Sequence, residues 1–473
     1  MEHESSGAEH GPDARGGSAH GGSEHAGVAV AGTGRRWSRR AMVRRAGIGM
    51  SAAGTGVVAA CGLGAPQGGR APAPSTQTGE VTWYIADHNQ DTRTWLEQTL
   101  NPSFVAGRPK VQVSMIYTAF GAEFDEKRDA LYAAGNGPDI LQSGASYAAV
   151  YALKKMAVPM DDRLKQWKDW SDFYPNVTAT AKFADKQYGI PSRIDARTMV
   201  YRKDLFDQRG LALPNTWDEM RTAALALSRR EGDEVKLIGY DTAAFNYQSM
   251  VWQVWQNGGE WLSPDGRKAV FNSPEAIDAV QFWADLIDAT APAGTTVPPA
   301  PTGLSRLAAG GAAAHLTNQG VIVGAMRSAP DVVPKLVSRP PLTRRKQIVN
   351  GFNNWFGIGS QGKVPDLAWE LLQHFGKPEH ILRFSETHSA VVPRRSLRET
   401  GYMADPRYQM PVWIEVIEKY ARPQPVIPLP AQSLRIGDEV AASVLTRKMT
   451  AKQALDDGVQ RWQALLDEGY RGL

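Results

Sequence analysis

The polar and aromatic side chains best suited to bind a ligand gather in one short stretch of the sequence. Asn246, Tyr247, Gln248 and Trp252 stand close together in a run that continues to Trp255. Amides supply both hydrogen-bond donors and acceptors, and aromatic rings pack on the apolar C–H faces of a sugar ring. We therefore expect Asn246, Tyr247, Gln248 and Trp252 to contact a carbohydrate. Trp252 and Trp255 lie three residues apart on one helix face, and we expect one of the two to serve packing alone.

A second polar group, Arg193 and Asp195, follows a Gly-Ile-Pro break and precedes the β-prone run 198–201. The break and the apolar run predict a strand that crosses between two bodies. A polar pair at such a crossing lies at the base of the cleft and faces a ligand. The alternative is an Asp–Arg surface pair, which contributes little to stability.

The first folded segment has the rhythm of a parallel sheet. Alternating apolar residues predict strands at 81–85 and 111–115 and a third near 140, with helices between them. Such units form right-handed crossovers, and their sheets bind ligands at the carboxyl ends of the strands. We expect ligand contacts from the side chains just after the first and third strands, which are Asp87, His88, Ser143 and Ser146.

Three motifs around the crossing strand carry a family resemblance. They are Y-G-I-P at 188–191, Y-R-K-D-L-F at 201–206 and P-N-T-W-D-E at 214–219, and the last has the Thr-x-x-Glu spacing of a helix capping box. Together they resemble the extracellular solute-binding proteins of ABC importers, in the sugar-binding group that includes maltose-binding proteins. The chain departs from the usual family motif at Arg202, where the family commonly has Asn. With the weaker matches further on, the resemblance covers most of residues 80–470.

The resemblance implies an α/β, two-lobed periplasmic-binding-protein-like fold of type II. In that fold each lobe is a mostly parallel sheet flanked by helices, and the ligand cleft lies between the lobes. We expect the N-lobe to comprise residues 80–194 and 350–405, and the C-lobe to comprise residues 195–349 and 406–473.

The same resemblance suggests roles for individual residues. The family position that matches Asp195 often holds an acidic group bonded to sugar hydroxyls. Residues 307–320 resemble a family segment whose Met is His315 here and whose sugar-stacking Trp is absent, so Asn318 and Gln319 are expected to take over polar contacts. We expect His315 to be packed or hydrogen-bonded rather than a metal ligand or general base. The strand predicted at 350–359 adds Asn354 and Trp355 as ligand contacts.

The N-terminal residues have the features of an export signal. Residues 1–34 contain almost no large apolar side chain, and we expect disorder there. Residues 35–60 combine a twin-arginine pattern with a short hydrophobic region, which predicts a signal peptide. Val-Ala-Ala-Cys at 58–61 resembles a bacterial lipobox, and Cys61 is the only cysteine of the chain. We therefore expect lipidation at Cys61, with 61–79 as a flexible tether that anchors the protein to a membrane surface.

Composition narrows the functional classes further. The chain of 473 residues is long enough for two domains, and its formal net charge of +4 lacks the clustered basic surface that nucleic acid requires. No apolar run approaches the ~20 residues that span a bilayer. Common catalytic motifs are absent, and pairs such as Asp161-Asp162 are adjacent and point in different directions. We expect no enzyme activity, no cofactor and no metal.

These observations favour a substrate-binding lipoprotein of an ABC importer, acting as a monomer on the outer face of the cytoplasmic membrane. It would capture a mono- or oligosaccharide and deliver it to the permease subunits by hinge closure. Two alternatives stay open. A secreted glycoside hydrolase would need two carboxylates about 5 to 9 Å apart in the cleft. A purely structural surface lipoprotein would have no deep pocket.

Overall fold

The computed structural model describes residues 77–86, 89–119, 121–144, 147–241, 245–292, 294–425 and 427–471. Of Ala122 and Phe352 it describes the backbone alone. The predicted extension, the signal peptide, Cys61 and most of the tether lie outside these ranges, as do Asp87, His88 and Ser146. In the part of the chain that is described, no helix is long and apolar enough to cross a membrane.

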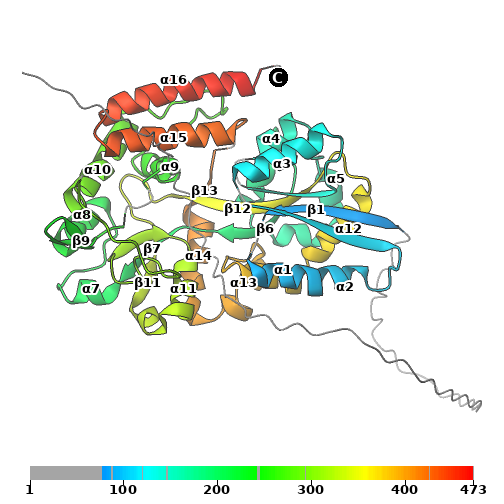
Figure 1. Cartoon of the computed structure of the whole chain (residues 1–473), viewed down its shortest axis with the longest axis horizontal. Helices are drawn as coiled ribbons and strands as arrows, with labels where there is room; N and C mark the ends of the chain where they lie inside the picture. Colours follow the sequence, from blue (N-terminus) through cyan, green and yellow to red (C-terminus); the bar gives the residue numbers. More distant parts are fainter. Residues whose placement is uncertain are drawn as a thin grey trace, which may run out of the picture. The chain divides into compact units, whose positions relative to one another are not determined.

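The first sheet has six strands, and its first three in the sequence form the predicted parallel unit (Figure 1). β1 lies between β2 and β3. β12 pairs antiparallel with both β3 and β6, and it pairs in parallel with β13. The strands are β1 (Gly79–Ala86), β2 (Val111–Thr118), β3 (Ile140–Gly144), β6 (Ile190–Asp195), β12 (Val349–Ile358) and β13 (Ala421–Pro423).

Helices cover both faces of the first sheet (Figure 1). They include α1 (Gln90–Trp95), α2 (Asn101–Val105), α3 (Ala122–Ala133), α4 (Ala148–Leu153), α12 (Pro365–Phe375) and α13 (Pro378–Thr387). In the core, the Phe356 ring makes edge-on contacts with Trp83 at 4.9 Å and with Phe375 at 5.1 Å. The buried Asp139 carboxylate accepts hydrogen bonds from the backbone of Thr82 and of Val364, so this residue joins three segments as a structural group.

The second sheet differs from the predicted parallel arrangement. Its central strand β7 (Thr198–Arg202) pairs antiparallel with both neighbours, β10 (Ala314–Thr317) and β11 (Leu336–Arg339). β10 and β11 are joined through α11 (Gly320–Ser328) and run parallel to one another, as a crossover requires. The chain enters this sheet directly from β6 as strand β7. The sheet is antiparallel because β7 lies between β10 and β11 and runs opposite to both.

The second sheet packs with a group of helices that form their own apolar core. These are α8 (Trp217–Leu227), α9 (Tyr247–Gln256), α10 (Pro274–Thr290), α15 (Pro430–Leu445) and α16 (Ala451–Gly469). In that core the rings of Trp261 and Phe271 stack at 4.1 Å. Figure 1 shows α15 and α16 lying side by side, with α9 below them.

The capping box predicted at residues 216–219 is confirmed at the start of α8. The Thr216 hydroxyl accepts from the Glu219 amide at 3.2 Å, and the Glu219 carboxylate accepts from the Thr216 amide at 3.2 Å. These two bonds satisfy amides that a helix start leaves without partners. The sequence signal alone therefore located the start of α8 correctly.

We expect Thr216→Ala to lower the free energy of unfolding by about 1 kcal/mol, because the capping oxygen is lost. Urea unfolding followed by circular dichroism would measure the change. Thr222→Ala is the matched control, since Thr222 is exposed on the same helix and its hydroxyl bonds only to the Asp218 carbonyl. If both variants lose the same stability, the cap contributes nothing.

Candidate functional site

The two sheets are joined by a very short crossing, in which Ala196 and Arg197 alone separate β6 from β7. At this crossing the Asp195 carboxylate accepts a hydrogen bond from Arg197 at 2.8 Å, and both side chains are largely buried. The sequence analysis expected Arg193 and Asp195 to face a ligand, with a surface pair between these two residues as the alternative. That pairing is not formed, because Asp195 is already bound to the residue that follows it by two positions.

Arg193 lies in a row of residues that crosses three strands. Asn354 on β12 is the direct neighbour of Arg193 on β6 and of Gly144 on β3. Residues directly opposite one another in antiparallel strands project from the same face of a sheet. The row therefore places a guanidinium and an amide on one face, at the carboxyl end of β3, where parallel sheets bind ligands.

The Arg193 guanidinium has no partner in this setting. It makes no hydrogen bond or ion pair with any residue that the structure describes, and its Nε atom is shielded from solvent. Burial lowers the pKa of Arg193, and the nearby Asp195 carboxylate acts in the opposite direction. Unpaired hydrogen-bond donors of this kind are costly unless something else satisfies them.

The second sheet presents charged groups beside the same crossing. On β10, His315 pairs with Val200 of β7, and burial lowers the pKa of its imidazole. The nearby Asp241 carboxylate accepts from Arg306 at 2.7 Å. His315 is thus a partly exposed side chain of β10 whose surroundings disfavour the charged form of its ring. Among the described residues no group of three metal-binding side chains occurs.

The start of α11 connects this side to the crossing strand. The Gln319 amide nitrogen lies 3.5 Å from the Ile194 carbonyl oxygen, and Gln319 Oε1 is buried without a hydrogen-bond partner. Asn318 has a local role, because its side-chain oxygen accepts from the Gly320 amide at 3.0 Å. Of these two predicted contacts, Gln319 is the one with an unused acceptor at the junction of the sheets.

The residues predicted on α9 are mostly used for packing. Tyr247 is 1% exposed and its ring lies between Trp261 and Trp462, at 5.3 and 5.2 Å. Trp252 is 7% exposed. Asn246 caps the helix by accepting from the Ser249 amide, and Gln248 is partly exposed. Tyr247 and Trp252 therefore pack inside the second core, because α9 is enclosed on nearly all sides, and their ligand contacts stay a prediction.

Trp355 and Ser143 are also buried rather than open to a ligand. Trp355 is 0% exposed, its indole N–H donates to the Gly144 carbonyl at 3.0 Å, and its ring packs edge-on against Tyr151 at 5.4 Å. Side chains alternate along a strand, so Trp355 faces away from Asn354 and packs in the core, and its ligand contact stays a prediction. Ser143 is 1% exposed and its hydroxyl lacks a hydrogen-bond partner.

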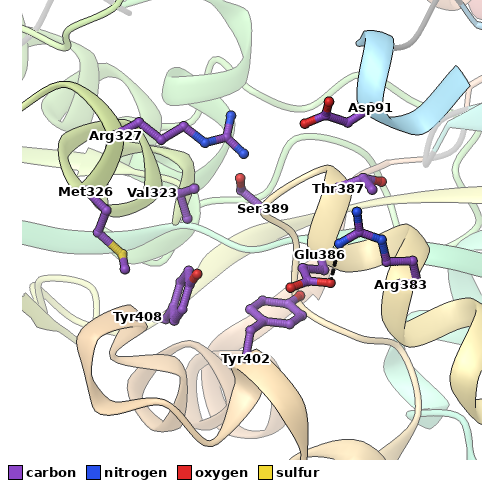
Figure 2. Close-up of a pocket in the computed structure, with 10 residues that line it drawn as sticks. All are labelled: Asp91, Val323, Met326, Arg327, Arg383, Glu386, Thr387, Ser389, Tyr402 and Tyr408. Carbon is purple, nitrogen blue, oxygen red and sulfur yellow. Dashed lines mark hydrogen bonds and ion pairs between the residues drawn. The ribbon is translucent and has the colours of Figure 1, made fainter. Parts of the chain in front are cut away.

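A pocket of about 180 Å³ lies between elements that belong to the two sheets (Figure 2). One side comes from α11, which joins β10 and β11 of the second sheet, and the other from α1 and α13, which cover the first sheet. The segment 401–408 completes it. The lining residues are Asp91, Val323, Met326, Arg327, Arg383, Glu386, Thr387, Ser389, Tyr402 and Tyr408.

The pocket combines aromatic and charged groups. The Tyr402 and Tyr408 rings meet edge-on at 5.5 Å, and the Tyr402 hydroxyl is buried without a hydrogen-bond partner. Arg383 pairs with Glu386 at 2.6 Å. Figure 2 shows the Arg327 guanidinium and the Asp91 carboxylate pointing toward one another from α11 and α1. Such a set suits a polyhydroxy ligand, since rings contact its C–H faces and charged groups bond its hydroxyls.

Sequence reasoning missed every residue of this pocket. The lining comes from segments as far apart as Asp91 and Tyr408, and none of them carries a motif. One available signal was Asp91, which follows β1 closely at the carboxyl end of a parallel strand. The tyrosines come from short helical turns whose position depends on the whole fold.

Comparison with known proteins gives a consistent result. The sequence profile of the family described as "Bacterial extracellular solute-binding protein" matches residues 86–380. A binding protein of Brucella abortus is 25% identical over 222 residues, which is 46% of this chain and 52% of that protein. An arabinooligosaccharide-binding protein of Halalkalibacterium halodurans is 29% identical over 102 residues, or 21% of this chain and 22% of that protein. The chain thus spans about half the length of the first of these relatives, and less of the second.

A solved structure resembles most of the chain. An ABC transporter solute-binding protein of Thermotoga lettingae, bound with α-D-tagatose, has a TM-score of 0.69 at 20% identity. The match covers 82% of this chain and 100% of that one. At this identity the likeness establishes the fold, so the predicted two-lobed α/β fold of type II is confirmed. The junction between the lobes is where β6 enters β7 and where the pocket lies.

Proposed function

The chain belongs to the bacterial extracellular solute-binding protein family, and from that premise we propose that it captures a saccharide and delivers it to the permease of an ABC importer. The observation that carries the proposal is the pocket lined from both lobes, next to a crossing with unused hydrogen-bonding groups. Two of the similar proteins add support, because one is an arabinooligosaccharide-binding protein and the structure of the other contains bound α-D-tagatose. No bond is made or broken in this function.

The proposed mechanism is closure about the crossing strands. A ligand that touches α11 on one side and α13 on the other gains contacts only when the lobes approach. Such a ligand binds the closed form more tightly, so it shifts the population toward that form. The permease would then distinguish loaded from empty protein by the closed shape.

We also propose the boundaries of the lobes and the route of export. The N-lobe comprises 80–194 and 350–405, and the C-lobe comprises 195–349 and 406–473. A twin-arginine signal would export the chain, and lipidation of Cys61 would hold it as a monomer on the outer face of the cytoplasmic membrane.

The hydrolase alternative finds less support. Asp91 and Glu386 are the two carboxylates that line the pocket, but Glu386 is an exposed group already paired with Arg383. A general acid requires a carboxyl kept protonated by its surroundings, and an ion pair favours the charged form. Product analysis by chromatography after prolonged incubation with each sugar tests this alternative directly.

The function is tested by ligand screening with the full chain carrying Cys61→Ser, which prevents acylation. We expect one class of mono- or oligosaccharide to raise the melting temperature by several degrees, since a thousandfold excess over Kd adds about 4 kcal/mol of stability. Amino acids and polyamines serve as controls. If no sugar changes the melting temperature, or if a sugar is cleaved, the proposed function is wrong.

Tyr408→Ala is expected to weaken binding of the sugar found in this screen by about tenfold, because a ring that packs on the ligand is lost. Isothermal titration calorimetry would measure the affinity. Tyr470→Ala is the matched control, as Tyr470 is a similarly part-exposed tyrosine at the end of α16. Equal affinities in both variants would show that the ligand does not use this pocket.

A further inference from the structure

The charges at the crossing do not balance. Arg197 occupies the Asp195 carboxylate at 2.8 Å, and Arg306 occupies the Asp241 carboxylate at 2.7 Å. Arg193 is left without an acidic partner among the described residues, although its Nε atom is shielded from solvent. Among the residues that the structure describes, the crossing therefore carries one positive charge without an acidic partner.

An enclosed guanidinium without a partner is unfavourable, because it has lost water without gaining a hydrogen bond. Arg193 is nevertheless held there by its strand, next to Asn354. We propose that the solute carries a carboxylate which binds Arg193, so that the ligand is an acidic saccharide such as a hexuronate or a short chain that contains one. This inference rests on the proposed function and narrows its substrate class.

The face of the row is uncrowded at its Gly144 end, on the far side of Asn354 from Arg193. At Gly144 an added Cβ would meet a single atom within 4 Å, Asn354 Oδ1 at 4.0 Å, so the space above this end of the row is open. The planar guanidinium presents parallel N–H donors that match the two oxygens of a carboxylate. The Asn354 amide beside it offers a donor and an acceptor to a neighbouring hydroxyl.

The same geometry disfavours a neutral sugar. A hydroxyl can accept hydrogen bonds from Arg193, but it carries no negative charge and would leave the charge of Arg193 unpaired. Sites built for a charged group reject analogues that lack it, because the unpaired group stays buried in the complex. The neighbouring Asp195 favours the charged form of Arg193 without forming an ion pair with it, and its Oδ1 accepts from Arg197.

The test uses the full chain carrying Cys61→Ser and isothermal titration calorimetry. The probes are D-galacturonate and D-glucuronate, alone and as di- and trisaccharides, with the matching neutral D-galactose and D-glucose series. D-glucose 6-phosphate separates a carboxylate from a phosphate site. We expect an acidic sugar to bind at least about 30-fold more tightly than its neutral parent, with an affinity that falls as salt is added.

Arg193→Gln should remove this preference, weakening the acidic sugar by about 30-fold or more while changing the neutral parent little. Arg209→Gln, at an exposed arginine that follows α7 (Lys203–Asp207), is the matched control and should keep the preference. The melting temperature of ligand-free Arg193→Gln should not fall, because the substitution removes an unpaired charge. That measurement separates a loss of recognition from a loss of folding.

The outcomes are distinct. Neutral sugars that bind as tightly as acidic ones, or an unchanged preference in Arg193→Gln, would overturn this inference and leave the proposed function intact. Tighter binding of the phosphate ester would overturn the carboxylate class. If no saccharide of any charge binds, the proposed function and this inference both fail.

Discussion

Trp355→Ala is expected to lower the free energy of unfolding by about 4 kcal/mol, the loss typical of a large aromatic side chain removed from a core. Trp355 is 0% exposed and packs with Tyr151, Tyr188 and Leu141 at the centre of the first lobe. Its removal leaves a cavity at the junction of β3, β6 and β12 and also takes the indole donor from the Gly144 carbonyl. Urea unfolding followed by circular dichroism would measure the loss.

Trp355→Phe separates packing from ligand contact. Phenylalanine keeps most of the ring but lacks the N–H, so stability should fall by about 1 to 2 kcal/mol. The affinity for a sugar should stay within about threefold of wild type, because a fully buried ring does not touch the ligand. A large loss of affinity with unchanged stability would instead restore the contact that the sequence predicted.

Local signals made much of the fold predictable. The capping box at Thr216 and Glu219 starts α8, and the helix expected between Pro365 and Gly376 is α12, from Pro365 to Phe375. Both signals depend on a few neighbouring residues, so they survive whatever the rest of the chain does. The order of β1, β2 and β3 followed from alternation and crossover rules in the same way.

The site was less predictable, because its members are chosen by tertiary structure. In a strand, residues two positions apart share a face, so the sequence offered Asp195 two equivalent partners, Arg193 and Arg197. Only the backbone at the crossing decides between them. Likewise, the amides and rings of α9 suit ligand recognition and core packing equally well. In the structure α9 is enclosed on nearly all sides, and most of its side chains pack in the core.

Gly189→Ala is expected to lower the free energy of unfolding by about 3 kcal/mol, at the upper end of the usual range for overpacking. A Cβ at this position would lie 2.2 Å from Trp355 Cε3 and 2.9 Å from the Phe356 carbonyl oxygen. Neither can easily move, since Trp355 is fully buried and Phe356 belongs to the sheet. Gly324→Ala is the matched control: nothing lies within 4 Å of that position in α11, so alanine should be neutral or stabilising.

The clash at Gly189 should also reach the ligand. Gly189 directly precedes β6, and Arg193 is the fourth residue of that strand, so a shift that relieves the clash moves the guanidinium relative to Asn354. Trp355→Leu removes the ring that clashes. The double variant with Gly189→Ala should therefore lose about 1 to 2 kcal/mol less stability than the sum of the losses of the two single variants. Strictly additive losses would mean that β6 is positioned without this contact. Coupled losses, with sugar affinity recovering in the double variant, would mean that the glycine of the Y-G-I-P motif is required because Trp355 fixes where the crossing strand begins.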